Sequence, residues 1–408
     1  MKKSLKKILG LFLVLSMMAV SFTACGSKDD ADKKDDAQKE DNKEDDNKTD
    51  DTEDGKDAGE ALESFMIGGI GPLTGGAASY GVSVKQGAEI AIEEINVAGG
   101  VSVGDKKFKL ELNFMDDEAT AEKAVPAFNA LMDAGADAIM GTVTSGAGMG
   151  IIDLTYEEGI LMLTPSGSAA GLTQYDNAFR LCFTDPLQGI TMADFAKEQG
   201  YNKIAVIYNN SDEYSTGMME AFVAQVEANG GEVVASESFV TDDVDFNTQL
   251  TAIKATDAQV IFVPAYYNDA AYITTQANDL GMDLSFLGGD GWDGVIAQTV
   301  DPTVLEGAIF LSPFLATDVS EAVQAFVTKY QEKYDVIPDQ FAADGYDSVY
   351  VIAAAMEKAA STASADLIAA MTQIEVTGVT GTITFNADGE PNKGAKLVEI
   401  KDGKYTAR

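Results

Sequence analysis

Histidine is absent from the 408 residues of this chain, and cysteine occurs only twice, as Cys25 and Cys182. Without an imidazole, Ser-His-Asp catalysis, Cys-His catalysis and histidine-ligated metal sites are excluded. Two cysteines can form neither a four-cysteine metal site nor a disulfide framework. Basic residues are also scarce, because 28 Lys and Arg oppose 66 Asp and Glu and leave a net charge of −38, which repels nucleic acid. Together these absences lead us to expect no enzyme activity, no cofactor, no metal and no nucleic-acid partner.

The first 25 residues have the pattern of a secretion signal. The basic start "MKKSLKK" is followed by "ILGLFLVLSMMAV", an apolar run that is too short to span a bilayer. The next residues, "SFTAC", resemble the lipobox of a bacterial lipoprotein, with Phe22 at the position where leucine is usual. We therefore expect cleavage before Cys25, a lipid on its thiol, and a location on the outer face of the cell membrane. A plain secretory signal, cleaved at another site, is the alternative.

Residues 26–62 are expected to form an acidic, disordered tether. Residues 26–60 contain twelve Asp, four Glu and seven Lys, and almost no apolar side chain. Such a segment cannot bury enough apolar surface to offset the entropy lost on folding. A flexible chain of this length would let a folded domain move above a membrane.

From Ser64 onward, short apolar strands alternate with amphipathic helices. The predicted strands are residues 64–70, 108–116, 136–141, 160–165, 201–209, 232–239, 258–265 and 285–290. Alternation of this kind predicts parallel sheets with right-handed crossovers. Because the alternation starts afresh after residue 200, we expect an α/β fold with two Rossmann-like lobes.

Two extended, apolar segments interrupted by proline, residues 177–189 and 307–318, are predicted to connect the lobes. Residues 381–390 and 395–408 are predicted to form a terminal pair of strands. The chain would then cross between lobes three times, and such a hinge permits closure of a cleft. The predicted lobes are 63–184 plus 315–384 and 185–314 plus 385–408.

The glycine-rich segment "GGIGPLTGG" is not a dinucleotide-binding fingerprint. From Gly69 it reads G-x-G-x-x-x-G with Pro72 inside, and no acidic residue ends a second strand about 20 residues on. We expect a loop that ends at "ASYG", lines a cleft and presents Tyr80. Asp116 and Asp117 are adjacent at a strand end, where side chains point in opposite directions, so we expect turn or cap residues.

Hydroxyl side chains follow two neighbouring predicted strands. Ser145 comes after "ADAIMG" and opens a predicted helix, and Ser166 and Ser168 follow "ILMLTP" in the same way. Open α/β sheets bind ligands at the carboxyl ends of their strands, and helix N-termini favour anions. A single serine at such a point is more often a helix N-cap. Two such loops side by side favour an anion site.

Asp290, in "GGDGW", belongs to the second series of strands, and in a closed cleft it could pair with an ammonium group. The alternative for Asp290 is an Asx turn. Trp292 is expected either near the cleft or in the core. Phe341 and Tyr346 lie on an apolar helix and are expected in the core, and Cys182 is expected to be a small buried apolar residue.

Seven blocks of sequence carry a resemblance to a known family: "GPLTGGAASYG", "GAEIAIEEINVAGGV", "MGTVTSGAGMG", "EEGILMLTPSGSAAGLT", "NAFRLCFTD", "SDEYSTG" and "FLGGDGWDG". In this order and spacing, from about Ser64 to the C-terminus, they resemble the leucine/isoleucine/valine-binding branch of the type I periplasmic binding proteins. The resemblance implies two lobes, three hinge strands and a ligand buried when the lobes close. Thr144 stands where the first described members carry a disulfide cysteine.

The resemblance also implies a function and a site. It implies a monomeric receptor that captures an amino acid, of the branched-chain type by preference, and delivers it to an ABC transporter permease. A sensor, or a receptor for another solute such as an amide or an aromatic acid, is the alternative. Ser145, Ser166 and Ser168 would hold the ligand carboxylate, and Asp290, where several relatives have glutamate, would hold the ammonium. The residues expected to line the cleft are Tyr80, Tyr214 and Tyr266.

Overall fold

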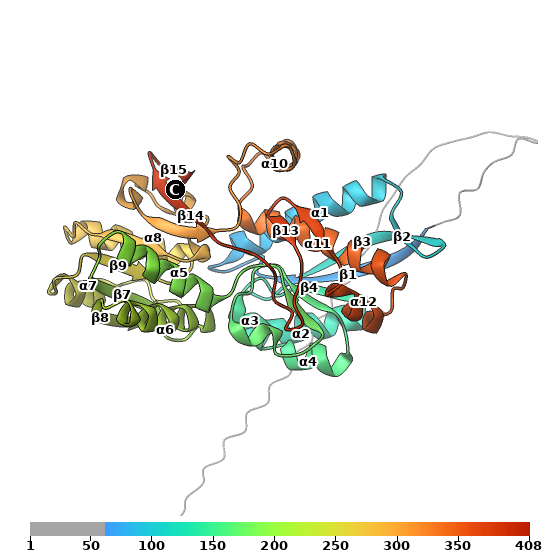
Figure 1. Cartoon of the computed structure of the whole chain (residues 1–408), viewed down its shortest axis with the longest axis horizontal. Helices are drawn as coiled ribbons and strands as arrows, with labels where there is room; N and C mark the ends of the chain where they lie inside the picture. Colours follow the sequence, from blue (N-terminus) through green and yellow to red (C-terminus); the bar gives the residue numbers. More distant parts are fainter. Residues whose placement is uncertain (1–61) are drawn as a thin grey trace, which may run out of the picture. The chain divides into compact units, whose positions relative to one another are not determined.

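The computed structural model describes residues 62–408, where helices and strands alternate along the chain (Figure 1). The expected signal, the lipidated Cys25 and residues 26–61 of the expected tether lie outside the described residues. Within residues 62–408, no helix combines the length and apolar character needed to cross a membrane.

The first sheet has six strands in the order β2-β3-β1-β4-β5-β6, and all neighbours are parallel except β2 and β3. Its strands are β1 (Glu63–Gly71), β2 (Val101–Val103), β3 (Lys106–Asp116), β4 (Ala138–Gly141), β5 (Met162–Thr164) and β6 (Ala178–Arg180). Alternate residues face opposite sides of the sheet, so Phe65 and Ile67 enter one core and Ile70 enters another.

Helices cover both faces of the first sheet. One face packs against α1 (Ala78–Val97), α11 (Gln340–Ala359) and α12 (Ser364–Met371), and the other against α2 (Ala121–Asp133), α3 (Ser145–Met149) and α4 (Ile152–Glu158). Two glycines let α1 and α11 cross closely. A Cβ on Gly87 would lie 1.9 Å from the Ala342 oxygen, and one on Gly345 would lie 2.1 Å from the Val84 oxygen. A side chain at either position would therefore separate the helices.

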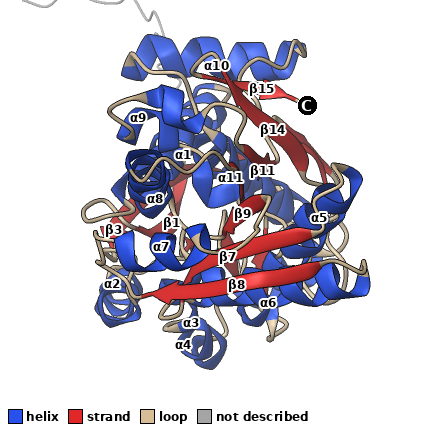
Figure 2. Ribbon diagram, turned by 90° about the vertical axis from the view of Figure 1, so that its left-hand side faces the viewer, coloured by secondary structure: helices blue, strands red, loops and turns tan. Residues whose placement is uncertain are grey.

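The second sheet has seven strands in the order β15-β14-β11-β10-β9-β7-β8. Its strands are β7 (Lys203–Asn209), β8 (Glu232–Phe239), β9 (Val260–Val263), β10 (Ser285–Gly288), β11 (Ile309–Ser312), β14 (Lys396–Lys401) and β15 (Lys404–Ala407). The last two are antiparallel to their neighbours, and the others are parallel. Figure 2 shows most of these strands following one another from β8 at the bottom to β15 at the top.

Helices α5 (Asp185–Glu198) and α6 (Glu213–Ala228) share a core with one face of the second sheet. The other face packs against α7 (Asn247–Lys254) and α8 (Tyr267–Asp279). The short helix α9 (Val295–Gln298) follows β10. In Figure 1 the elements of the second sheet lie on the left and those of the first on the right.

The late part of the chain returns to the first sheet and leaves it again. After β11, helix α10 (Glu321–Tyr334) shares a small core with α1 and α11, and a hairpin of β12 (Val376–Gly378) and β13 (Gly381–Ile383) precedes β14. The two α/β sheets confirm the predicted fold class. The residue limits of the two lobes stay a prediction.

Three local predictions were wrong. Residues 185–189 are helical, because Thr184 caps α5 by accepting a hydrogen bond from the Leu187 amide and Pro186 fits the first turn. The two C-terminal segments do not pair with each other, since β13 pairs with β12 and β15 pairs with β14. The helix predicted after β4 is divided into α3 and α4.

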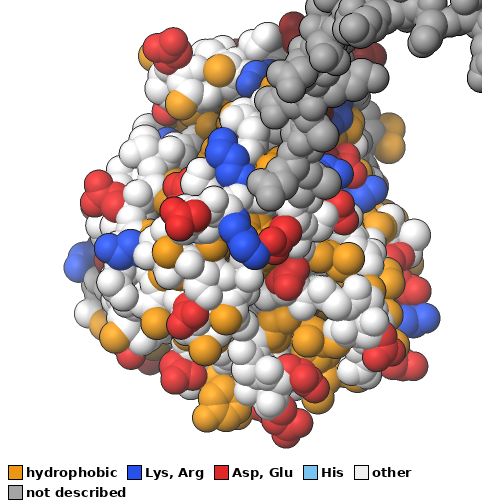
Figure 3. All heavy atoms as spheres, turned by 90° about the vertical axis from the view of Figure 1, so that its right-hand side faces the viewer, with side chains coloured by type: hydrophobic (Ala, Val, Ile, Leu, Met, Phe, Trp, Pro, Cys, Tyr) orange, Lys and Arg blue, Asp and Glu red, His pale blue; other side chains and the backbone are white. Residues whose placement is uncertain are grey.

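Charged side chains are spread over the surface in the view of Figure 3, where acidic, basic and hydrophobic groups alternate. Some form ion pairs, such as Lys106 Nζ with Glu63 Oε1 at 2.6 Å and Lys333 Nζ with Glu93 Oε2 at 2.8 Å. Exposed pairs of this kind each contribute about 1 kcal/mol or less, so the buried apolar cores hold the fold.

Candidate functional site

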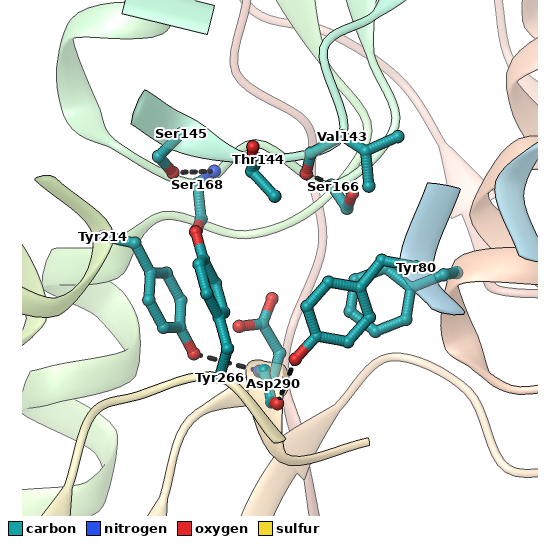
Figure 4. Close-up of a pocket in the computed structure, with 11 residues that line it drawn as sticks. Tyr80, Val143, Thr144, Ser145, Ser166, Ser168, Tyr214, Tyr266 and Asp290 are labelled. Atoms are coloured by element: carbon teal, nitrogen blue, oxygen red, sulfur yellow. Dashed lines mark hydrogen bonds between the residues drawn. The ribbon is translucent and has the colours of Figure 1, made fainter. Parts of the chain in front are cut away.

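One cavity brings together all seven residues that were predicted from the sequence to bind the ligand (Figure 4). Its lining consists of Tyr80, Val143, Thr144, Ser145, Ser166, Ser168, Tyr214, Tyr266, Asp290, Gly291 and Phe341. The cavity holds about 230 Å³ of empty space, including the part open to solvent.

The lining residues come from both sheets. Ser145 opens α3 after β4, and Ser166 and Ser168 lie between β5 and the short 3₁₀ helix Ala170–Thr173. Tyr266 precedes α8 after β9, and Asp290 follows β10. These positions lie beyond the carboxyl ends of parallel strands, where open α/β sheets bind ligands.

Serine side chains tie two loops together on one side of the cavity. Ser145 Oγ accepts hydrogen bonds from the amides of Ser168 at 3.2 Å and Ala169 at 3.1 Å. Ser166 Oγ donates to the Val143 carbonyl at 2.7 Å. In the described chain the Ser145 hydroxyl proton has no acceptor, so it is free to donate to a bound anion. Thr144 Oγ1 is buried and also lacks a partner among residues 62–408.

The structure excludes one alternative for these loops and corrects one expectation. Ser145 does not act as an N-cap, because its oxygen bonds the neighbouring loop and Thr144 holds the cap position of α3. Ser166 and Ser168 do not open an α-helix, because only a 3₁₀ turn follows them. Since α3 has five residues, its dipole is small, and the anion-binding capacity of this side rests on hydroxyl and amide donors.

Asp290 lies on the opposite side of the cavity, as Figure 4 shows. Its side chain is 4% exposed, and Oδ1 accepts a hydrogen bond from Gln188 Nε2 at 3.1 Å. Gln188 Oε1 accepts a hydrogen bond from the Asp290 amide at 2.8 Å, so one glutamine side chain holds both the carboxylate and the backbone of Asp290. Burial raises the pKa of Asp290 to about 6. No basic side chain lines the cavity, so an ammonium group on a ligand would compensate this charge.

A second buried carboxyl group lies close to Asp290, since Gln188 Nε2 also donates to Asp185 Oδ1 at 3.5 Å. Asp185 is 1% exposed, and its Oδ2 has no hydrogen-bond partner within residues 62–408. Burial, followed by repulsion from Asp290 and Asp212, raises the pKa of Asp185 well above its usual value. The sequence analysis missed both Asp185 and Gln188, which lie on α5. Their position within the predicted connecting segment, residues 177–189, was the only available signal.

Aromatic rings form the remaining walls. Tyr214 and Tyr266 stack with ring centroids 4.8 Å apart, and Tyr80 lies 4.0 Å from the ring of Phe341. The Tyr80 hydroxyl accepts a hydrogen bond from the Tyr267 amide at 3.0 Å and donates to the Gly291 carbonyl. Tyr80, from the first sheet's side, therefore bonds two backbone segments that follow strands of the second sheet.

The structure also corrects or confirms the neighbouring assignments. Tyr80 was predicted in a loop but lies in the first turn of α1. Phe341 is buried in the core as predicted, and its ring also lines the cavity. Tyr346 lies away from the cavity, with its hydroxyl 2.7 Å from Glu94 Oε2. Trp292 is fully buried and donates to the Val263 carbonyl, so it belongs to the core.

The predictions for three smaller groups are confirmed. Cys182 is buried, with 2% of its surface exposed. Asp116 accepts hydrogen bonds from the amides of Leu73 and Glu118, and Asp117 accepts one from the Ala119 amide. Both residues therefore lie in turns and accept hydrogen bonds from turn amides, as predicted.

Comparison with known proteins agrees with this geometry. A family model described as periplasmic binding protein matches residues 64–404. The chain is 31% identical to Leu/Ile/Val-binding protein homolog 3 of Brucella melitensis biotype 1 over 340 residues, which cover 82% of this chain and 90% of that protein.

Two solved structures share the fold. One is the branched-chain amino acid transporter substrate-binding protein LivJ from Streptococcus pneumoniae in complex with isoleucine, with 32% identity, a TM-score of 0.78, and coverage of 85% of this chain and 98% of that one. The other is a leucine-binding protein LivK from Thermotoga maritima, with 28% identity, a TM-score of 0.77, and coverage of 84% and 97%. The chain therefore belongs to the type I periplasmic binding proteins, a family of solute-binding proteins that are not enzymes.

Proposed function

We propose that this protein is the extracytoplasmic substrate-binding component of an ABC importer and that it captures a branched-chain amino acid. One observation carries the proposal: the cavity has hydroxyl groups on one side and a buried carboxylate, Asp290, on the other. An α-amino acid carries the two complementary charges on one carbon atom. Relatives named for binding leucine, isoleucine and valine support the same class of ligand.

The ligand carboxylate would lie against Ser145, Ser166 and Ser168. The free hydroxyl proton of Ser145 would donate to the carboxylate, and hydrogen bonds to a charged group contribute about 1.5–3 kcal/mol each. The rings of Tyr80 and Tyr266 would then contact an uncharged side chain.

The ammonium group would pair with Asp290. This carboxylate is buried, and burial raises its pKa to about 6, so a neighbouring cation would offset the cost of its charge. A ligand that supplies the cation relieves this cost only when both sides of the cavity surround it. The proposed ligand would therefore favour the closed arrangement of the lobes.

The cellular context of the proposal rests on the sequence. We propose that Cys25 carries a lipid anchor and that residues 26–62 tether the domain to the outer face of the membrane. A permease would receive the ligand from the monomeric, closed protein. Uptake of labelled leucine by cells with and without the gene would separate transport from a purely sensory role, since a sensor would leave uptake unchanged.

Isothermal titration calorimetry of the unfolded and refolded chain against the twenty amino acids tests the proposal directly. Refolding removes any ligand that copurifies. We expect tight binding of leucine, isoleucine and valine and weak or no binding of charged amino acids. Binding of aromatic acids or amides alone would contradict the proposal, because those ligands leave Asp290 without an ammonium partner.

A further inference from the structure

Arg180 is an unusual residue in this chain. Among the 28 basic residues only two are arginine, and the other, Arg408, is the C-terminal residue. Arg180 lies at the end of β6 and is fully buried, with 0% of its surface exposed. A buried guanidinium is costly unless its donors are paired, so its contacts show what the residue does.

The guanidinium bonds the segment that carries two of the site serines. Arg180 Nη1 donates to the Gly167 carbonyl at 3.2 Å, and Gly167 lies between Ser166 and Ser168. Arg180 Nη2 donates to the Ala170 carbonyl at 3.4 Å and to Thr173 Oγ1 at 3.3 Å. One side chain thus bonds this segment at three points.

The third donor of Arg180 pairs with a residue far along the chain. Nε lies 2.8 Å from Glu390 Oε2, and Glu390 Oε1 accepts a hydrogen bond from Thr173 Oγ1 at 2.7 Å. Glu390 belongs to the segment between β13 and β14, which connects the β12–β13 hairpin to the second sheet. This pair therefore couples the serine segment to the connection that leads into the second sheet.

The connecting segment is itself held tightly against β6. A Cβ on Gly389 would lie 2.3 Å from the Ala178 carbonyl oxygen, and the φ of Gly389 is +75°, so a side chain is excluded there. The Arg180 amide donates to the Gly389 carbonyl at 3.1 Å. Glu390 is thus presented to Arg180 by a backbone with little freedom to move.

From these contacts we propose that Arg180 is a positioning residue, which fixes the Ser166–Ser168 segment for the ligand carboxylate through its bonds to Gly167, Ala170 and Thr173. The part that concerns the carboxylate rests on the proposed function. Arg180 does not line the cavity, so it acts through the segment and not by contact with the ligand. Lysine cannot replace it, because an ammonium group presents its donors from one point and lacks the planar fork.

The test compares Arg180→Lys with the wild-type full chain by hydrogen-exchange mass spectrometry and by calorimetric titration with leucine. We expect amide exchange in residues 165–173 to be faster by about tenfold or more, with other segments unchanged. We expect the dissociation constant for leucine to rise by about tenfold or more. Arg408→Lys is the matched control, because Arg408 is partly exposed and contacts Glu399, Gln199 and the ring of Phe195, all outside residues 165–173.

Each outcome decides the inference. Unchanged exchange in residues 165–173, or equally faster exchange throughout the chain, would overturn the positioning role. If Arg180→Lys fails to fold, Thr173→Val serves as the second variant, because it removes one of the three bonds between Arg180 and the segment. The inference then requires faster amide exchange in residues 165–173 of this variant. If the wild type binds no amino acid, the proposed function fails, while the exchange measurement still decides whether Arg180 holds the segment.

Discussion

Replacing Asp290 with asparagine should weaken ligand binding and, at the same time, stabilise the unliganded protein. Asparagine has nearly the same shape and keeps an oxygen that can accept the hydrogen bond from Gln188. It removes only the negative charge. The substitution therefore separates the role of the charge from that of the packing.

The loss of affinity follows from the burial of the carboxylate, which is 4% exposed. Removing one partner of a buried, hydrogen-bonded charge pair costs about 2–5 kcal/mol. We therefore expect the dissociation constant for leucine to increase by about 30-fold or more. The wild-type affinity should also fall below pH 6, where the buried Asp290 becomes protonated, and the variant should lack this pH dependence.

The gain in stability follows from the pKa. Burial raises the pKa of Asp290 from 3.8 to about 6. The folded state therefore holds the Asp290 proton more tightly than the unfolded state does. The stability that this protonation provides is fully present below pH 4 and is lost as the pH rises through 6. At pH 8 the ionised group thus disfavours folding by about 3 kcal/mol, and asparagine removes this cost. We expect a melting temperature above that of the wild type at pH 8 and no gain near pH 4.

Calorimetric titration and thermal melting of the same samples give both readouts. Asp117→Asn is the matched control, because Asp117 is fully buried, has a pKa raised to about 7 by burial, and lies outside the cavity lining. The control should gain stability at pH 8 and keep its affinity. Binding by the Asp290 variant within threefold of the wild type would refute the ammonium role. A lower melting temperature at pH 8 would refute the electrostatic reasoning.

Three further predictions follow from the cavity and the buried acids. Ser145→Ala should weaken leucine binding by about 1–3 kcal/mol in calorimetry, because the hydroxyl is free to donate; an unchanged affinity would contradict this role. Tyr80→Phe should accelerate leucine release about tenfold in stopped-flow fluorescence, because the hydroxyl bonds both Tyr267 and Gly291; an unchanged release rate would mean that these bonds do not hold the cleft closed. Wild-type protein without ligand should melt at a higher temperature at pH 5 than at pH 8, because buried acids such as Asp117 have raised pKa values; the opposite order would show that they are compensated.

The residues predicted to bind the ligand line one cavity, and several of them could be found because strand ends can be located from sequence. An apolar run followed by hydroxyl or glycine residues marks the end of a buried strand, and parallel strands bring such ends to one edge of a sheet. Ser145, Ser166 and Ser168 were found in this way. Asp290 and the three tyrosines needed the family resemblance, because nothing in their local sequence distinguishes a cavity wall from a turn or a core position.

Phe341 was correctly placed in the core, but its ring also lines the cavity, and periodicity cannot separate a core face from a cavity face. The errors concern strand pairing and the start of a helix. The pairing of the C-terminal strands was wrong because a short strand can pair with any open edge nearby. In the same way, Thr184 and Pro186 begin a helix where extended backbone was expected.

By itself, the sequence determined the class of the fold, the family and the strand ends where the serines lie. It did so because hydrophobic periodicity and motif order are local properties, written in consecutive residues. Only the tertiary structure decided that Gln188 fixes Asp290, that Tyr80 bonds backbone on the second sheet's side, and that Glu390 reaches Arg180. These contacts join residues 100 or more positions apart. Such pairs depend on how the elements pack, and no local pattern of residues encodes that.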